Sequence, residues 1–251
     1  MRQVIVAALL GLAVSGCVTT ETVQFRPSAQ QQALIRDGQA ALVSRLKNSI
    51  VIIRPAARQF KVGGRPVFVV GISNLTNGPL EFRVANVEVS QLVNGQAASL
   101  KVITYEQLVS EEHDRQVFAA IGTGLVAASN AAAASNAGYY RSNSTVYTPH
   151  GAYHVSAAGY SPTAAAIARG EANAQNEAMI EATVQRGQAN LAALERGVIK
   201  DNTLLPGEWY GGQLHIQPLV GDNGSTQVTY EIVVNVGPDR HEIQIVQGAG
   251  A

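Results

Sequence analysis

The sequence is poor in cysteine, in charge and in aromatic residues. Cys17 is the single cysteine among 251 residues, so no disulfide can form within the chain. Charged residues make up 14% of the chain and balance at 18 basic and 18 acidic, which excludes the basic footprint of a nucleic-acid-binding protein. Aromatic residues make up 6%, whereas there are 24 glycines, which indicates a lightly packed fold rich in small residues. A core without covalent links must stabilise it.

The sequence also lacks the short motifs that most catalytic chemistry needs. No glycine pattern surrounds a serine as in a nucleophile elbow, and no phosphate-binding loop is present. His150 and His154 have a metal-ligand spacing only on a helix, and the neighbouring Pro149 and Gly151 disfavour one. The run 111–114 (Glu-Glu-His-Asp) does not converge on one helix face. We therefore expect no enzyme, no metal and no cofactor, with an envelope hydrolase as the least favoured alternative.

The N-terminus has the pattern of a secretory leader. Arg2 is the only charge in the first twenty residues, and an almost unbroken apolar run extends from Val4 to Val14. A short positive region followed by a short apolar region and small residues is typical of a signal peptide, and it is too short to span a bilayer.

The end of this leader, Val14-Ser15-Gly16-Cys17, resembles the lipobox of bacterial lipoproteins. The resemblance implies that the signal peptide, residues 1–16, is removed and that Cys17 is lipidated. The acyl chains then hold the protein in membrane lipid. Position 18 is Val rather than the Asp that signals inner-membrane retention in enteric members, so the family rule favours the outer membrane, facing the periplasm. An ordinary secreted protein with a free Cys is the alternative.

Residues 17–48 are predicted to hold the lipid anchor, a tether and one short helix. Val18 to Ala29 is polar, threonine-rich and without periodicity, which indicates a tether. Gln30 to Lys47 then places apolar residues at roughly helical spacing, although Gly38 weakens the pattern. These apolar residues are Leu34, Ala41, Leu42 and Leu46.

Residues 49–104 change to the period of β-strands and are predicted to form the first half of a β-sandwich. Runs of β-branched residues are bounded by proline and glycine, and later runs alternate apolar with polar. Asn94-Gly95 has the composition of a type I′ hairpin turn. The predicted strands are 50–53, 66–72, 80–84 with 87–89, and 98–104.

Residues 105–198 are rich in alanine and are predicted to form a helical hairpin, with Ser161-Pro162 beginning its second helix. Two seams of apolar residues recur at steps of three and four, and the two Ala-rich helices are expected to meet through a close-packed, small-residue interface. The twenty-five residues between Arg115 and Arg141 are uncharged, so a membrane-inserting helix remains an alternative. The first seam is Phe118, Ile121, Leu125, Ala128 and Ala132, and the second is Ile180, Val184, Gly187, Leu191, Leu194 and Val198.

The predicted loop between these helices, residues 136–160, holds five of the eight tyrosines. Tyrosine offers a broad amphipathic contact area at low entropy cost, so the cluster is a candidate partner-binding surface. The alternative is a structural role in which the rings pack on one another and on the helix ends. The five are Tyr139, Tyr140, Tyr147, Tyr153 and Tyr160.

Residues 199–251 return to strands and are predicted to form the second half of the sandwich. Both halves resemble bacterial envelope immunoglobulin-like sandwiches, the first in 70–74 and 79–82 (Val-Gly-Ile-Ser-Asn and Pro-Leu-Glu-Phe), the second in 205–208 and 211–214 (Leu-Pro-Gly-Glu and Gly-Gly-Gln-Leu). Four strands alone would leave an apolar face and open edges. The predicted fold class is therefore mainly β: one immunoglobulin-like sandwich interrupted by an Ala-rich helical hairpin.

These patterns favour a lipid-anchored envelope protein with a non-catalytic binding or structural role. Its partners are expected to be membrane lipid, through acylated Cys17, and an envelope protein or a second copy, through the hairpin and its tyrosines. An oligomeric assembly or secretion accessory lipoprotein is the alternative.

Overall fold

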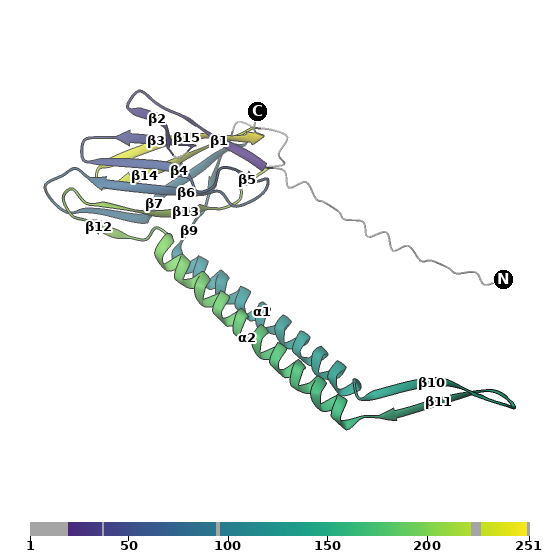
Figure 1. Cartoon of the computed structure of the whole chain (residues 1–251). Helices are drawn as coiled ribbons and strands as arrows, with labels where there is room; N and C mark the ends of the chain where they lie inside the picture. The colour runs from purple at the N-terminus through teal and green to yellow at the C-terminus, as the bar shows by residue number, and fades with distance from the viewer. Residues whose placement is uncertain (1–19, 37, 94–95, 222–226, 250–251) are drawn as a thin grey trace. The chain divides into compact units, whose positions relative to one another are not determined.

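The computed structural model describes residues 20–36, 38–93, 96–221 and 227–249. The chain divides into two compact units (Figure 1). Residues Met1–Ile103 and Ile199–Ala251 form the first, here called the sandwich unit, and Thr104–Val198 form the second, the hairpin unit. Each is described by itself below.

The sandwich unit contains two antiparallel sheets. The seven-stranded sheet has the order β12-β7-β14-β15-β1-β5, with β8 also paired to β7, and the six-stranded sheet has the order β2-β3-β4-β6-β13-β9. The strands of the first are β1 (Thr20–Arg26), β5 (Phe60–Lys61), β7 (Leu80–Val93), β8 (Gln96–Leu100), β12 (Asn202–Leu204), β14 (Val228–Val236) and β15 (Asp239–Ala249). The strands of the second are β2 (Gln31–Arg36), β3 (Gln39–Arg45), β4 (Ser49–Pro55), β6 (Val67–Asn74), β9 (Val102–Ile103) and β13 (Trp209–Ile216).

Strands from both sides of the insertion complete both sheets, as the sequence predicted. β13 pairs with β6 and β9, and β14 pairs with β7. The alternation in β4 buries every second side chain, and Val51 and Ile53 are fully buried. They belong to one apolar cluster with Ile232 and Ile243 of the other sheet. Apolar burial between the sheets is therefore the main stabilising term of this unit.

The predicted helix at 30–47 is wrong, because this segment forms the hairpin of β2 and β3. Arg36 pairs with Gln39, and Gly38 takes a φ of +72°, which glycine adopts without strain. The apolar residues fit a strand equally well, since Ala41 and Leu42 are buried at the start of β3. The backbone pairing of β3 with β4 stabilises the strand rather than the helix that the spacing of apolar residues predicted.

The predicted tether is wrong from Thr20 to Arg26, which form β1. This strand pairs with β15 along its length, from Glu21 opposite Ala249 to Arg26 opposite Gln244. A partner more than 200 positions away in the sequence leaves no local signal. The predicted turn at Asn94-Gly95 lies outside the described residues, although the flanking Val93 and Gln96 pair with each other.

The hairpin unit contains α1 (Tyr105–Asn136), β10 (Tyr139–Thr148), β11 (Gly151–Tyr160) and α2 (Pro162–Gly197). Thr104 and Gln107 form a capping box at the start of α1. Ser161 caps α2 and Pro162 is its first residue, as predicted. The two helices pack on each other, so the helical hairpin is confirmed. The predicted loop between them is wrong, since β10 and β11 pair over ten residues.

Candidate functional site

The two helices of the hairpin unit meet through small and hydrogen-bonding side chains. Thr123 Oγ1 lies 3.2 Å from Thr183 Oγ1, and the Asn130 side chain donates to Asn176 Oδ1 at 2.9 Å. Near the start of α1 the Asn190 amide donates to Glu112 Oε1 at 3.0 Å. Glu112, Thr123 and Ala134 lie eleven residues apart, as do Ala165, Asn176 and Gly187 on α2. An eleven-residue repeat keeps one face of each helix in contact without a left-handed supercoil.

The large apolar side chains in the middle of α1 point away from this contact. Phe118, Ile121 and Leu125 are 74%, 57% and 70% exposed. Ile121 and Leu125 stand two residues on either side of Thr123, which at about 100° per residue puts them on the opposite side of the helix. We call Phe118, Ile121, Leu125, Ala128 and Ala132 the outer α1 face.

The apolar seam of α1 therefore faces away from α2, and the contact runs through small residues, as the predicted small-residue interface requires. The helices are closest where alanine, glycine, threonine and asparagine allow it, which leaves the larger side chains outside. On α2 the predicted seam divides, because Gly187 is buried whereas Ile180 and Val184 are exposed. Among the described helices, α1 is the one long and apolar enough to cross a membrane by length and composition, and most of it is exposed.

Five predicted site residues lie on the two-stranded ribbon of β10 and β11. All five tyrosines are exposed, Tyr147 most of all at 82%. Near the helices, the rings of Tyr139 and Tyr160 pack with centroids 5.0 Å apart. Tyr140 lies over Gly159, opposite it on β11, where an added Cβ would come within 2.7 Å of the Tyr140 Oη.

The tyrosines thus fall into two groups. Tyr139, Tyr140 and Tyr160 pack locally at the base of the ribbon, which is the structural alternative. Tyr147 and Tyr153 lie near the turn, where Tyr153 pairs with the exposed Val146. Among the described residues each strand of the ribbon pairs only with the other, so the outer edges keep unpaired backbone groups.

A buried polar cluster in the sandwich unit has no counterpart in the predictions. Ser49 Oγ donates to Asp239 Oδ2 at 2.8 Å and also lies 2.8 Å from His241 Nε2. The other ring nitrogen of His241 lies 2.9 Å from Ser44 Oγ. Asn48 donates to Asp239 through its backbone and its side chain, both at 2.8 Å. Because these residues lie some 190 positions apart, no local motif reveals them.

The order of contacts differs from that of a hydrolytic triad. In a triad the carboxylate orients the histidine, which takes the proton of the serine. Here the carboxylate accepts directly from Ser49, and His241 has a serine at each ring nitrogen. Ser49 and His241 are 0% and 1% exposed, so no substrate reaches the serine while the sandwich is closed. The cluster joins β3 and β4 of one sheet to β15 of the other.

The protonation states fit this structural role. Burial lowers the pKa of His241 to about 4, against a smaller upward effect of the Asp239 charge. Burial raises the pKa of Asp239, but hydrogen bonds from Ser49 and Asn48 outweigh it and the pKa lies below its usual value. At neutral pH the cluster is a neutral imidazole beside a hydrogen-bonded carboxylate.

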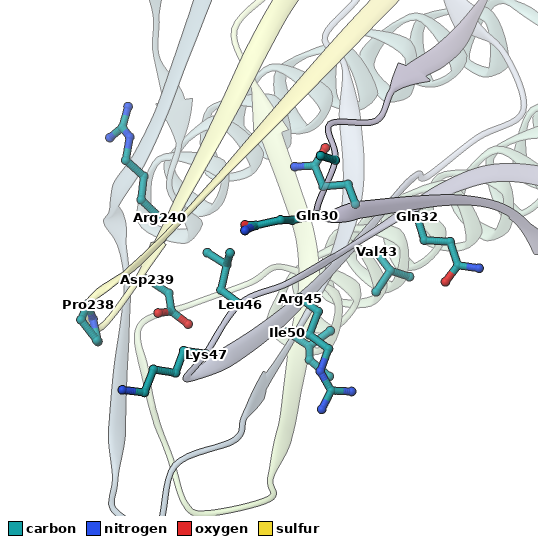
Figure 2. A pocket seen from close by; sticks show the side chains of 12 residues that line it. Gln30, Gln32, Val43, Arg45, Leu46, Lys47, Ile50, Pro238, Asp239 and Arg240 are labelled. Carbon is teal, nitrogen blue, oxygen red and sulfur yellow. The ribbon is translucent and has the colours of Figure 1, made fainter.

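An open groove of about 870 Å³ lies beside this cluster (Figure 2). Arg45, Lys47 and Arg240 line it together with Asp239. Asp239 is engaged by Asn48 and Ser49, and Arg240 contacts Glu242 at 2.9 Å and Glu88 at 3.3 Å. The groove therefore offers cationic contacts through Arg45 and Lys47.

The remaining candidates stay apart. His154 lies on the ribbon, 2.9 Å from Thr145 Oγ1, and His150 lies in its turn. Within the described ranges no three His, Cys, Asp or Glu side chains gather in a way that could hold a metal ion. Cys17 lies outside the described residues. Comparison of the chain with family models, with curated proteins and with solved structures finds no match.

Proposed function

We propose that this protein is a lipid-anchored, non-catalytic structural component of the bacterial envelope, held by Cys17 in the outer membrane and facing the periplasm. Its hairpin unit associates with the hairpin unit of a second copy. The observation that carries the proposal is the outer α1 face, whose large apolar side chains are exposed, while Thr123 and Asn130 on the opposite side of the helix contact α2. An immunoglobulin-like sandwich belongs to the same proposal, supported by the antiparallel pairing and the shared core.

The outer α1 face is complementary to itself in the antiparallel sense. The bulky Phe118 stands five residues before Thr123, and the small Ala128 stands five residues after it. A two-fold axis at the level of Thr123 therefore places Phe118 against Ala128 of the partner copy and Ile121 against its Leu125. The bulky Phe118 then meets a small residue, and the two branched aliphatic side chains meet each other, as in a self-complementary isologous interface. Each large apolar side chain buried contributes roughly 1.5–3 kcal/mol before the cost of association.

Membrane insertion of the hairpin is the competing explanation for an apolar α1. It is disfavoured by α2, which accompanies α1 along its length. Glu181 and Arg186 flank Thr183, the residue that meets Thr123, and Glu177 lies one turn further along. Each such charge costs roughly 2.5–3.5 kcal/mol at the centre of a bilayer. Contact with a protein surface covers the apolar face of α1 and leaves the charged side chains of α2 in water.

The association is tested on the chain from Val18, which lacks the leader and Cys17 and contains every described element. Sedimentation velocity should show a dimer that Ile121→Glu with Leu125→Glu converts to a monomer, since two carboxylates cannot be buried unpaired. The matched control is Ala174→Glu with Ala178→Glu, which adds the same charge to exposed positions of α2 facing away from α1. A monomeric wild-type chain, or equal loss in the control, contradicts the proposal.

The antiparallel arrangement has a separate test. A chain from Val18 has no native cysteine, so Phe118→Cys with Ala128→Cys introduces its only thiols. Ten helical residues separate them by about 15 Å, too far for a bridge within one copy. Oxidation should therefore give a covalent dimer. Phe118→Cys alone should form no covalent dimer under the same oxidation, and a covalent dimer from this single variant would indicate a parallel pair instead.

The lipid anchor is tested in the bacterial cell. Labelled palmitate should enter the protein and be lost in Cys17→Ser, and the variant should leave the membrane fraction. Label in both proteins, or in neither, contradicts lipidation at this residue. The association experiment above does not depend on this outcome, because it uses the chain without Cys17.

The end of the ribbon is a second candidate contact, favoured by the exposure of Tyr147 and Tyr153. A photoreactive residue at position 147 should capture an envelope protein in intact cells, whereas one at position 139, where the ring packs on Tyr160, should capture far less. Equal capture at both positions, or none, would remove the ribbon as a specific contact.

A further inference from the structure

Cys17, the proposed lipidation residue, lies close in the sequence to β1, so the anchor limits how far this strand can lie from the membrane. Two residues, Val18 and Thr19, separate Cys17 from the start of β1 at Thr20. A fully extended chain spans about 3.3–3.6 Å per residue. Once Cys17 is lipidated, the start of β1 therefore lies within about 10 Å of the lipid attachment point. The end of the sandwich that contains Thr20 is held at the membrane surface.

Basic residues gather at this end of the sandwich unit. Thr20 pairs with Lys61 of β5, and Figure 1 shows β5 beside the start of β1. Arg58 lies in the connection between β4 and β5, and its guanidinium is 3.5 Å from the position of a Cβ on Gly38, in the β2–β3 turn. Arg36 ends β2 at the same turn. Arg36, Arg58 and Lys61 are all exposed.

The charge is one-sided although the whole chain is neutral. From Gly38 to Leu80 the sequence holds six Lys or Arg residues and no Asp or Glu. Four of the six, Arg54, Arg58, Lys61 and Arg65, lie between the end of β4 and the start of β6, whereas Arg45 and Lys47 lie at the other end. Among the described residues of the sandwich unit, the exposed carboxylates lie toward the other end of the sheets. Glu81 begins β7, and Glu208 directly precedes Trp209, which pairs with Ser73 near the end of β6. Asp37 and Asp222 lie outside the described residues.

We propose that this end of the sandwich unit, with Arg58 and Lys61 at its centre, contacts the anionic headgroups of the membrane that holds Cys17. The inference rests on the proposed lipid anchor for its geometry, and it adds a second, electrostatic contact with the same bilayer. Cations near an anionic surface attract it over about one Debye length, so the short tether keeps Arg58 and Lys61 within range.

The test uses the chain from Val18, which lacks Cys17 and therefore carries no acyl chains, and vesicles of equal parts phosphatidylcholine and phosphatidylglycerol. Co-sedimentation should show binding that is weak on pure phosphatidylcholine and falls at high salt. Arg58→Gln with Lys61→Gln should lower the partition coefficient about 25-fold, because each cation near an anionic surface contributes about fivefold. Unchanged thermal unfolding of the variant shows that the sandwich is intact.

Arg45→Gln with Lys47→Gln is the matched control. These exposed cations line the groove near the β14–β15 turn, away from β5, and their loss lowers the net charge equally. Binding of this control should stay within about twofold of the wild type. Equal weakening in both variants would show a general charge effect and overturn the proposal. Equal binding to neutral vesicles would overturn it in favour of insertion by α1. Neither result bears on palmitate labelling, so the lipid anchor stands or falls separately.

Discussion

Acid should weaken the sandwich unit through His241, because the buried imidazole cannot take up a proton as readily as the unfolded chain does. Its pKa falls from 6.5 to about 4 on folding. Below pH 6.5 the unfolded state therefore binds more protons than the folded state, and stability declines until about pH 4, where both states are protonated. Each pKa unit is worth about 1.4 kcal/mol, so the decline amounts to about 3 kcal/mol.

The measurement is urea unfolding from neutral pH down to about pH 4, followed by the fluorescence of Trp209. This is the single tryptophan and lies on β13, so it reports on the sandwich unit, whereas circular dichroism in the far ultraviolet follows the helices. The lowered pKa of Asp239 acts only below its ordinary value of 3.8 and leaves this window undisturbed.

The matched variants are His241→Asn and His154→Asn. His241→Asn should be less stable at neutral pH, because it breaks a buried hydrogen-bonded cluster, but its stability should lose most of the pH dependence between 6.5 and 4. His154→Asn changes an exposed ribbon residue and should keep the wild-type slope. If wild type and His241→Asn show the same slope, burial of a neutral imidazole is not the source of acid sensitivity.

Two further predictions concern local packing. Gly211→Ala should destabilise the sandwich unit by about 1–3 kcal/mol, because the new Cβ would lie 2.3 Å from the Val70 carbonyl oxygen. The control is Gly71→Ala, directly opposite on β6, where the new Cβ meets Trp209 only at 3.9 Å. It should cost less than about 1 kcal/mol in the same urea experiment. Equal losses would contradict this. Thr104→Ala removes the side-chain oxygen that caps α1 and should lower the helix melting temperature by an amount equivalent to about 0.5–2 kcal/mol, with the exposed Thr163→Ala on α2 as a neutral control. An unchanged melt in Thr104→Ala would mean that packing on α2 alone fixes the helix start.

Local periodicity was enough to predict those helices and strands whose residue patterns are pronounced. The strand runs at 50–53 and 66–72 lie within β4 and β6 or at their edges, and Ser161-Pro162 does begin α2. The sequence alone also determined the insertion, because an alanine-rich segment with helical spacing interrupts β-branched runs on both sides. Completion of one sandwich by both halves followed from the need to cover apolar faces, and β14 on β7 confirms it.

The wrong predictions fall in segments whose strand partners lie far away in the sequence, because pairing with those partners decides whether the segment forms a strand. The segment 30–47 has apolar residues that suit either period, and its pairing with β4 selects the strands. β1 is a strand only because β15 lies beside it. Residues 139–160 are polar and glycine-containing, as loops are, and yet they pair in register across the ribbon.

What the sequence by itself determined is the mainly β class and the helical hairpin, because each rests on the order of neighbouring residues. The tertiary structure alone decided which face of α1 is buried. Spacing shows that Phe118, Ile121 and Leu125 share a face, but it does not say which neighbour that face meets. Thr123, Ala127 and Asn130 allow α1 to approach α2 closely, so their side of α1 meets α2 and the apolar face points outward. This orientation makes the hairpin a candidate interface.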